Sequence, residues 1–361
     1  MPFGTNAAAL IEIKSSAQID QFVTSVDQAA CYDENYQLMH EKRDAARTRQ
    51  TYAELLGFLR DSGYHFVTPT PATHARIIGR AGRDHARSLE DVLGWSLPFD
   101  PALLPTEIIE LLDAANVIVR HADGRMKATI RVSSVHGNLF VHSAFPTSEV
   151  DSVFLGPDSY RFADYILAKL RPTADGGRIL DYGAGAGVGG ITAAIQWPDS
   201  MLTLADINPK ALYLASINAD FAGLGHVALE ATSPAELEGD FDLIVTHPPF
   251  MMDRDKRAYR DGGDLYGARL SLNWVLEGLT KLTPGGRLIL HTGISIVGGR
   301  DLFREQIAKQ VRAPGWTIDY HELDPDIFSE DLDEPAYAEV DRIAAVGMCI
   351  TRSADNEPAQ K

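Results

Sequence analysis

The chain has 361 residues, 33 Lys and Arg against 50 Asp and Glu, and a formal charge of −17. This length fits two domains, and a content of 45% hydrophobic and 23% charged residues is typical of a globular protein. Two distant cysteines, Cys31 and Cys349, argue against a zinc site and a disulfide framework. The sequence has neither an apolar run of about 18 residues nor a signal-peptide pattern at its start, so we expect a cytoplasmic protein without a metal or a membrane partner.

The first 150 residues predict an accessory domain of helices and antiparallel strands. Apolar residues recur on one face of residues 41–60, which indicates a helix. A second, shorter helix is expected over 105–115. Residues 117–143 hold three strand-like runs separated by Asp123-Gly124 and by a turn at 136–138, which predicts an antiparallel meander of three strands. We therefore expect an N-terminal α+β domain over 1–150 that shapes the substrate site.

From about residue 151 the pattern changes to alternating strands and helices. Strands are expected at 178–180, 201–206, 226–231, 241–246, 285–293, 316–323 and 344–352. Alternating βα units predict a mostly parallel, doubly wound sheet with helices on both faces. The second domain is expected over 151–352, and the polar residues 353–361 are expected to form a disordered tail. Ligands of such sheets bind at the carboxyl ends of the strands.

A glycine-rich turn follows the first of these strands. The run DYGAGAG starts at Asp181, and Asp206 stands at the end of the next strand. Glycines let the backbone approach a ligand closely, and an acidic residue at this place accepts hydrogen bonds from ribose hydroxyls. The pattern predicts a ligand that contains adenosine and leaves NAD and S-adenosylmethionine (SAM) as alternatives.

The fourth strand ends in THPPF, where His247 precedes two prolines and Phe250. The prolines fix the backbone and remove two N–H donors, so the carbonyl and side chain before them are held in one geometry. An aromatic residue follows that can stack on a flat group. These features predict a substrate site at this strand end.

At this point the chain resembles the class I SAM-dependent methyltransferases, in the branch with an Asn-Pro-Pro-Tyr/Phe signature. That branch includes release-factor glutamine, rRNA guanine-N2 and adenine-N6 methyltransferases. The resemblance covers about residues 151–350, and it is carried by VFLGPDSYRFAD, DYGAGAG, DINPKAL, THPPF, RAYRDGGDLYGARLSL and LTPGGRLILHTG. It implies a seven-stranded Rossmann-like methyltransferase sheet, with SAM as the cofactor.

The resemblance also implies roles for individual residues. Three glycines, Gly183, Gly185 and Gly187, would pass under the methionine and ribose of SAM. Asp181 would lie near its amino group, Asp206 would hold the ribose, Ile207 would pack on the adenine, and Thr232 is the best candidate for the adenine amine. Tyr160, with Asp158, Ser159 and Arg161, either closes over the methionine end or belongs to an ordinary helix start.

His247 departs from the family, which has Asn at this position to accept hydrogen bonds from an NH2 nucleophile. Three interpretations stay open: His247 orients an altered nucleophile, acts as a general base, or only packs. On the same side we expect Pro248, Phe250 and Tyr259, the last in a segment that is either a mobile flap or a surface loop. His291 ends the fifth strand near this pocket, and His74 is a weaker candidate from the first domain.

We therefore expect a SAM-dependent methyltransferase. The acidity disfavours nucleic acid, because binding to phosphates depends on Lys and Arg, and with the altered Asn it favours a nitrogen of a small molecule or amino-acid-like substrate. One alternative is methylation of rRNA or of a protein glutamine. Another is an enzyme that cyclises SAM itself and releases methylthioadenosine.

Overall fold

The structure is a computed structural model that describes residues 46–257 and 259–354. The expectations for the start of the chain, for Cys31 and for most of the tail fall outside these residues. The chain divides into a unit Met1–Thr51 and a unit Tyr52–Lys361. Of the first unit, residues 46–51 are described, and they are helical. Among the described residues, no helix is long and apolar enough to cross a membrane.

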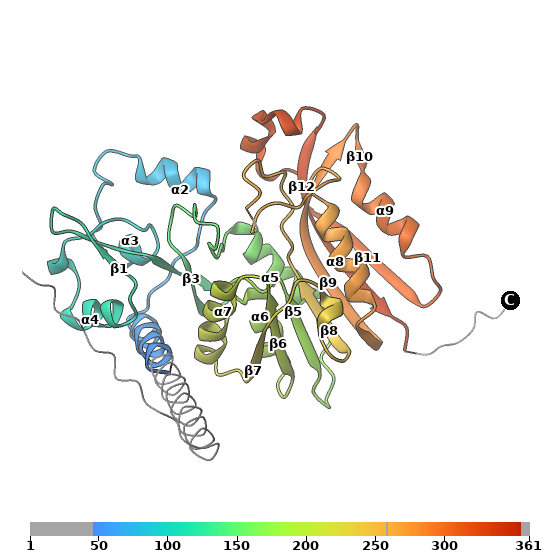
Figure 1. Cartoon of the computed structure of the whole chain (residues 1–361), viewed down its shortest axis with the longest axis horizontal. Helices are drawn as coiled ribbons and strands as arrows, with labels where there is room; N and C mark the ends of the chain where they lie inside the picture. Colours follow the sequence, from blue (N-terminus) through green and yellow to red (C-terminus); the bar gives the residue numbers. More distant parts are fainter. Residues whose placement is uncertain (1–45, 258, 355–361) are drawn as a thin grey trace, which may run out of the picture. The chain divides into compact units, whose positions relative to one another are not determined.

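The second unit is built on one large sheet with the strand order β11-β12-β9-β8-β5-β6-β7 (Figure 1). The five strands from β9 to β7 run parallel, and β12 is antiparallel to both of its neighbours. The strands are β5 (Arg178–Tyr182), β6 (Met201–Asp206), β7 (His226–Glu230), β8 (Phe241–Thr246), β9 (Leu282–Val297), β11 (Trp316–Asp324) and β12 (Arg342–Arg352), with the short β10 (Arg300–Asp301) beside β9. All seven predicted strands are present, and the predicted fold class is confirmed.

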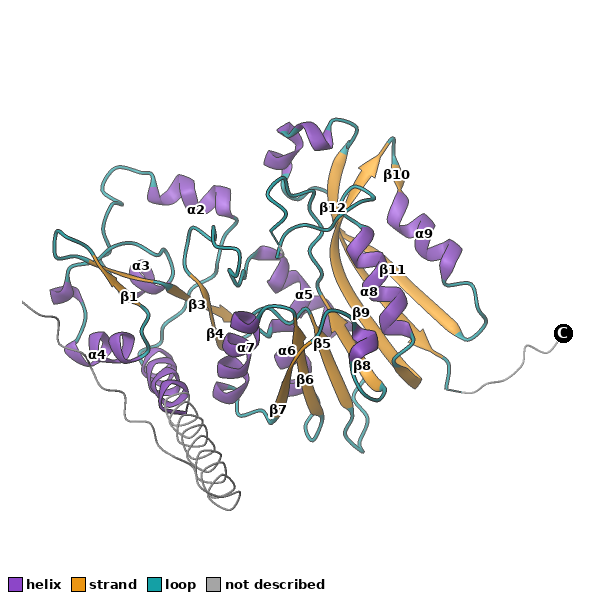
Figure 2. Cartoon of the chain, viewed as in Figure 1, coloured by secondary structure: helices purple, strands orange, loops and turns teal. Residues whose placement is uncertain are grey.

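Helices cover both faces of this sheet (Figure 2). One face packs against α5 (Pro157–Lys169), α6 (Val188–Gln196) and α7 (Pro209–Phe221), and the other against α8 (Arg269–Leu279) and α9 (Leu302–Gln310). Successive strand residues serve opposite faces: Ile179 joins the core under the first set and Leu180 the core under the second. Short 3₁₀ turns complete the unit: η2 (Pro234–Glu236), η3 (Ser329–Asp333) and η4 (Pro335–Tyr337).

Residues 52–150 of the same unit form helices and two hairpins. The elements are a helical stretch 52–61, α2 (Pro71–Ile78), α3 (Leu89–Leu93), η1 (Pro101–Leu103), α4 (Thr106–Ala114), β1 (Ile118–Arg120), β2 (Met126–Ala128), β3 (Ile130–Val135) and β4 (Asn138–Ser143). The predicted three-stranded meander is therefore wrong, because β1 pairs with β2 and β3 with β4 in separate sheets. The two hairpins are separated at Thr129, between β2 and β3. Its N–H donates to the carbonyl of Val117, and its carbonyl accepts from the N–H of Ala144.

The second hairpin, β3 and β4, is joined to the part of the unit after residue 150 by buried hydrogen bonds. The Asn218 side chain on α7 pairs with the backbone of Val141 at 2.8 and 3.1 Å, and it also donates to the carbonyl of Ala186 at 2.9 Å. The Thr68 N–H donates to the Tyr160 hydroxyl at 2.9 Å. These contacts lie within one compact unit, and the domain boundary near residue 150 stays a prediction.

A buried cationic cluster lies in this part of the chain. Arg131 is 2% exposed and donates to the carbonyl of Ser143 at 3.3 Å and to Nδ1 of His74 at 3.4 Å. No carboxylate of the described residues lies within ion-pair distance of Arg131. His142 is fully buried, with Nε2 2.8 Å from the Ser133 hydroxyl. Burial, then the Arg131 charge, holds the pKa of His142 well below its ordinary range and lowers the pKa of His74 to about 4.

Both histidines are therefore neutral in the folded protein, whereas in the unfolded chain they take up protons near pH 6.5. We predict that the contribution of these two histidines to stability falls as the pH drops below about 6.5, because in the unfolded state they then bind more protons. Replacing both, as His74→Gln with His142→Asn, should flatten this dependence at a cost of about 1 kcal/mol per lost hydrogen bond at neutral pH. Urea unfolding between pH 7 and 4.5 measures it, with the exposed His121→Asn as control, and an unchanged slope in the double variant would contradict it.

Candidate active site

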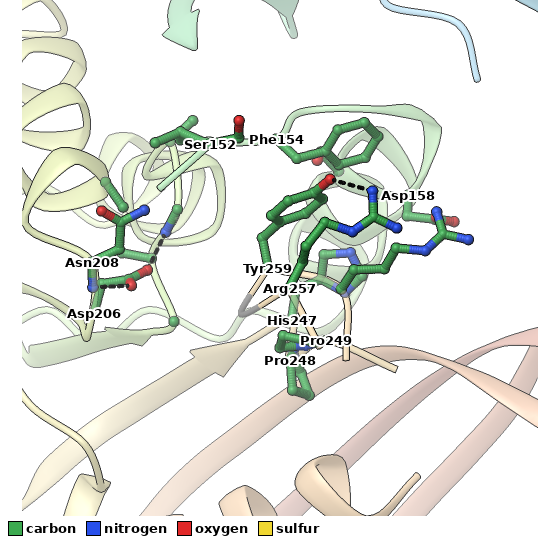
Figure 3. A pocket seen from close by; sticks show the side chains of 18 of the residues that line it. Ser152, Phe154, Asp158, Asp206, Asn208, His247, Pro248, Pro249, Arg257 and Tyr259 are labelled. Atoms are coloured by element: carbon green, nitrogen blue, oxygen red, sulfur yellow. Dashed lines mark hydrogen bonds between the residues drawn. The ribbon is translucent and has the colours of Figure 1, made fainter. Parts of the chain in front are cut away.

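A cavity of about 480 Å³ opens at the carboxyl ends of β5, β6 and β8. Figure 3 shows Asp206 and Asn208 on one side of it and His247, Tyr259 and Arg257 on the other. The lining contains ten of the twelve predicted site residues: Asp181, Gly183, Gly185, Asp206, Ile207, Thr232, His247, Pro248, Phe250 and Tyr259. The sheet topology thus brings together residues from five separate segments of the sequence.

The glycine turn forms the floor between β5 and α6. Gly183 and Gly185 have φ angles of +71° and +55°, where L side chains are strained. A Cβ on Gly183 would lie 2.5 Å from a ring carbon of Trp274 on α8. Glycine is therefore required at Gly183 by the backbone conformation and by the close approach of the indole. The bare backbone leaves space for a ligand at this edge.

Asp206 closes the turn from the end of β6. Its carboxylate accepts hydrogen bonds from the N–H of Gly185 and of Asn208, both at 2.9 Å. Burial raises the pKa of Asp206, and these backbone donors partly oppose that rise. Each carboxylate oxygen keeps a second lone pair, so the group can still accept from the hydroxyls of a ribose in the cavity.

Asp181 lies deeper, at 1% exposure, with one oxygen accepting from the Gly190 N–H at 2.7 Å. Burial raises the pKa of Asp181 to about 8, and the nearby Asp206 adds to the rise. Two buried carboxylates beside one cavity favour a cationic ligand, because a positive charge would stabilise both ionised forms. The sulfonium and ammonium groups of SAM fit this requirement.

The opposite end of the ligand space carries the predicted adenine contacts. Ile207 is 49% exposed and lines the cavity together with Thr232. The Thr232 hydroxyl donates to Glu236 at 2.6 Å, and the Thr232 N–H donates to the same carboxylate at 2.9 Å. This leaves the Thr232 oxygen as an acceptor for an adenine amine. Glu236, which fixes that orientation, was not predicted, because it follows in the 3₁₀ turn η2 rather than at a strand end.

Two of the predicted cofactor residues lie outside the lining. Gly187 stands at the N-cap of α6 with φ +80°, and a Cβ there would lie 2.9 Å from Ile191 in the core. Tyr160 extends toward residues 52–150, where its hydroxyl accepts from Thr68. His74, a weaker candidate, is fully buried, with Nε2 3.0 Å from the Trp95 carbonyl. Gly187 therefore serves the turn and Tyr160 the contact between the two parts.

His247 directly follows β8 and is held by the neighbouring strand. Its Nδ1 lies 2.9 Å from the carbonyl oxygen of His291 on β9. Because a carbonyl only accepts, Nδ1 carries the hydrogen, and Nε2 of the neutral ring is left with a free lone pair. Burial lowers the pKa of His247, opposed in part by the charge of Asp158. The ring is therefore neutral at pH 7, and the described residues offer no hydrogen bond to Nε2.

Aromatic side chains surround the His247 end of the cavity. Phe250 and Phe162 have ring centres 5.8 and 5.6 Å from that of His247. Tyr259 donates to the Thr147 carbonyl at 2.7 Å, and its ring lies 6.3 Å from that of Phe154. The lining also includes Phe145 and Phe328. Sequence reasoning missed Phe145 and Phe328, which come from loops outside the motifs, and it did not single out Phe154, although this residue lies in the stretch VFLGPDSYRFAD.

Two arginines from the segment after β8 also line this end. Arg257 donates to both oxygens of the buried Asp253, and Arg260 pairs with Asp253 at 3.5 Å and with Asp331. These ion pairs hold the segment after β8 at the His247 end of the cavity. This segment was expected to be either a mobile flap or a surface loop. Arg257 and Arg260 are thus cationic groups at the cavity of a chain whose net charge is negative.

We predict that Asp181 destabilises the ligand-free protein at alkaline pH and strengthens SAM binding. A carboxyl pKa raised to about 8 means that the folded state keeps a proton which the unfolded chain releases above about pH 4, so the contribution of Asp181 to stability falls as pH rises from 4 to 8. Asp181→Asn should remove this slope and stabilise the ligand-free protein at pH 8 by at least about 1.4 kcal/mol, one pKa unit. It should also weaken SAM binding.

Urea unfolding of the ligand-free protein at pH 5 and 8 and calorimetric titration with SAM measure the two effects. The exposed Asp175→Asn serves as the control. A variant that binds SAM like the wild type, or that keeps the wild-type pH slope, would show that Asp181 has a different role.

The comparisons with known proteins agree with this geometry. A family model described as methyltransferase small domain matches residues 160–290. The release factor glutamine methyltransferase of Deinococcus radiodurans is 31% identical over 188 residues, which are 50% of this chain and 65% of that protein. The ribosomal RNA small subunit methyltransferase C of Hahella chejuensis is 30% identical over 125 residues, 35% of this chain and 34% of that protein. The chain thus spans less than two thirds of the length of these relatives.

These relatives correct the expected partner. The sequence favoured a small-molecule acceptor and disfavoured nucleic acid, whereas both relatives are named for macromolecular substrates, a release factor and ribosomal RNA. The expectation was wrong because it relied on the net charge of −17, which sums the whole surface. The charge near a site is set by local residues, and here Arg257 and Arg260 stand at the cavity.

The family match extends from α5 to β9 and contains the glycine turn, Asp206 and the His-Pro-Pro-Phe stretch. These are the features that line the cavity, and their chemistry suits a ribose, a cation and a planar donor group. Residues 160–290 thus match the methyltransferase small domain, in agreement with the resemblance that the sequence motifs indicate.

Proposed function

We propose that this protein transfers the methyl group of SAM to a planar NH2 group of a macromolecule, with a glutamine amide of a protein as the first candidate. A relative that matches 188 residues is named for that reaction. Asp181, Gly183, Gly185, Asp206, Ile207 and Thr232 would hold SAM. The acceptor would enter on the side of His247 and Tyr259.

The observation that carries the proposal is the set of hydrogen-bond acceptors at the end of β8. His247 presents an unprotonated Nε2, and Pro248 and Pro249 have no N–H to offer. This stretch therefore presents one ring nitrogen and carbonyl oxygens, but no backbone donor, toward a substrate. An amide or nucleobase NH2 supplies two donors in one plane, and it matches such a site better than a hydroxyl, which supplies one.

The residues of the chain contribute mainly by positioning. SAM, when bound, supplies a methyl group on a positively charged sulfur, so the transfer needs no further activation of the donor. His247 and Pro248 would orient the acceptor nitrogen, and the ring of Phe250 beside His247 would restrict its plane. Alignment of reacting groups in a desolvated cavity supplies much of the rate of such a step.

A second candidate is methylation of a base amino group in RNA. Five aromatic residues at the acceptor end, Phe145, Phe154, Phe250, Tyr259 and Phe328, are suited to stack on an unpaired base. A relative named for ribosomal RNA supports this candidate. A glutamine side chain has no base to stack on aromatic rings, but its amide offers the same planar NH2 group as a base amino group.

The proposal is tested with SAM that carries a labelled methyl group. We expect label in a bacterial peptide-chain release factor, at a glutamine found by peptide mass spectrometry, and formation of S-adenosylhomocysteine. Label in small ribosomal subunits instead would favour the second candidate. Methylthioadenosine formed from SAM alone, without label in either acceptor, would overturn methyl transfer and support cyclisation of SAM.

We predict that His247 controls turnover and not SAM binding. His247→Ala should lower the methyl-transfer rate by about 10²–10⁴-fold if the ring takes a proton, while SAM affinity measured by calorimetry stays near that of the wild type. His247→Asn should keep part of the activity, because its amide oxygen also accepts from an NH2 group. A wild-type rate for His247→Ala would mean that other residues hold the acceptor.

A further inference from the structure

A buried carboxylate next to the acceptor site is not used by the features described so far. Asp158 starts the first turn of α5, is 2% exposed and lines the same cavity as His247. One of its oxygens accepts from Arg161 at 3.1 Å. The other, Oδ2, is buried and has no hydrogen-bond partner among the described residues. An orphaned carboxylate oxygen is costly, which indicates that it serves a group that becomes charged.

The helix geometry places Asp158 near His247. Asp158 and Phe162 are four residues apart, so they share one face of α5. The Phe162 ring centre lies 5.6 Å from that of His247 and 6.3 Å from that of His291. Figure 3 shows Asp158 on the His247 side of the cavity, away from Asp206. Asp158 therefore lies one helical turn from the Phe162 ring, which packs near His247.

We propose that Asp158 is a positioning residue that makes His247 the general base of the reaction. This inference rests on the proposed function. The charge of Asp158 stabilises the imidazolium that forms when Nε2 takes a proton, while the His291 carbonyl keeps the other hydrogen on Nδ1. Asp158 does not itself contact the reacting atoms.

The step balances without a further reactant. The acceptor nitrogen forms a bond to the methyl carbon, the bond between that carbon and sulfur breaks, and its electron pair stays on sulfur, giving a neutral thioether. The nitrogen then loses one of its two protons to Nε2 of His247. The new imidazolium releases this proton to solvent after the product leaves.

The other charges around His247 leave Asp158 as the source of this effect. Arg161, on the same helix, divides its guanidinium between Asp158 and Asp324 at 3.1 and 2.7 Å. His291, from β9, is neutral, since burial and the nearby His247 hold its pKa well below its ordinary range. From the segment after β8, Arg257 and Arg260 line the cavity but are paired with Asp253. Burial raises the pKa of Asp158 and lowers that of His247, and the charge of each group partly opposes the shift of the other.

The first test needs no acceptor. NMR of protein labelled with ¹³C and ¹⁵N in histidine gives the tautomer and the pKa of His247, with His247→Asn to assign its signals. We expect the Nδ1–H form, and we expect Asp158→Asn to lower the pKa of His247, because the negative charge is lost. Asp324→Asn is the matched control, since it removes the other carboxylate on Arg161 and should shift the pKa of His247 less. A pKa of His247 that is unchanged in Asp158→Asn would overturn the proposal.

The second test uses the methyl acceptor identified by labelling. Asp158→Asn should lower the rate at neutral pH by about tenfold or more, move the acid limb of the rate profile to lower pH, and leave SAM affinity unchanged. Asp158→Glu, which restores the charge, should recover part of the rate. Weaker SAM binding with an unmoved acid limb would assign Asp158 to the cofactor instead. Because the NMR result needs no acceptor, failure of the proposed function and failure of this inference remain distinguishable.

Discussion

The hydrogen bond between Nδ1 of His247 and the carbonyl of His291 fixes the chemistry of the cavity. It follows directly from the sheet, because β8 and β9 are parallel neighbours with Thr246 opposite Leu290. The next residues of the two strands are therefore His247 and His291. Strand pairing thus sets the tautomer of the ring, and the tautomer decides that the free nitrogen accepts rather than donates.

The same strand ends concentrate buried charge. Asp181 and Asp206 lie at the carboxyl ends of adjacent strands, β5 and β6, and each is held by backbone N–H groups of the glycine turn or the following helix. Their raised pKa values mean that the ligand-free protein carries unfavourable carboxylates at this edge. A cationic ligand relieves this cost, so the instability of the empty site contributes to its affinity for SAM. Sites of this kind exchange stability for function.

The sequence predicted the sheet and much of the lining at its strand ends, since their signals are local. DYGAGAG, Asp206 and THPPF each stand at the end of an apolar strand, and parallel strands bring such ends together. The hairpins before residue 144 were mispredicted, since the break at Thr129 depends on two backbone bonds to distant residues. Phe328 and Phe145 reach the acceptor side from loops more than 180 residues apart in the numbering, and no spacing rule links such residues to a motif.

A histidine in place of asparagine changes what the surrounding residues must supply. An asparagine amide accepts through its oxygen and stays neutral, so it needs no charged neighbour. A histidine must be held in one tautomer, and once it takes a proton it needs a counter-charge in a desolvated cavity. The His291 carbonyl supplies the first, and the second is the role proposed above for Asp158. The unpartnered Oδ2 of Asp158 and Nε2 of His291 are the cost of this arrangement in the resting protein. Buried polar groups without partners are rare in folded chains, and these two flank the ring whose charge changes on proton transfer.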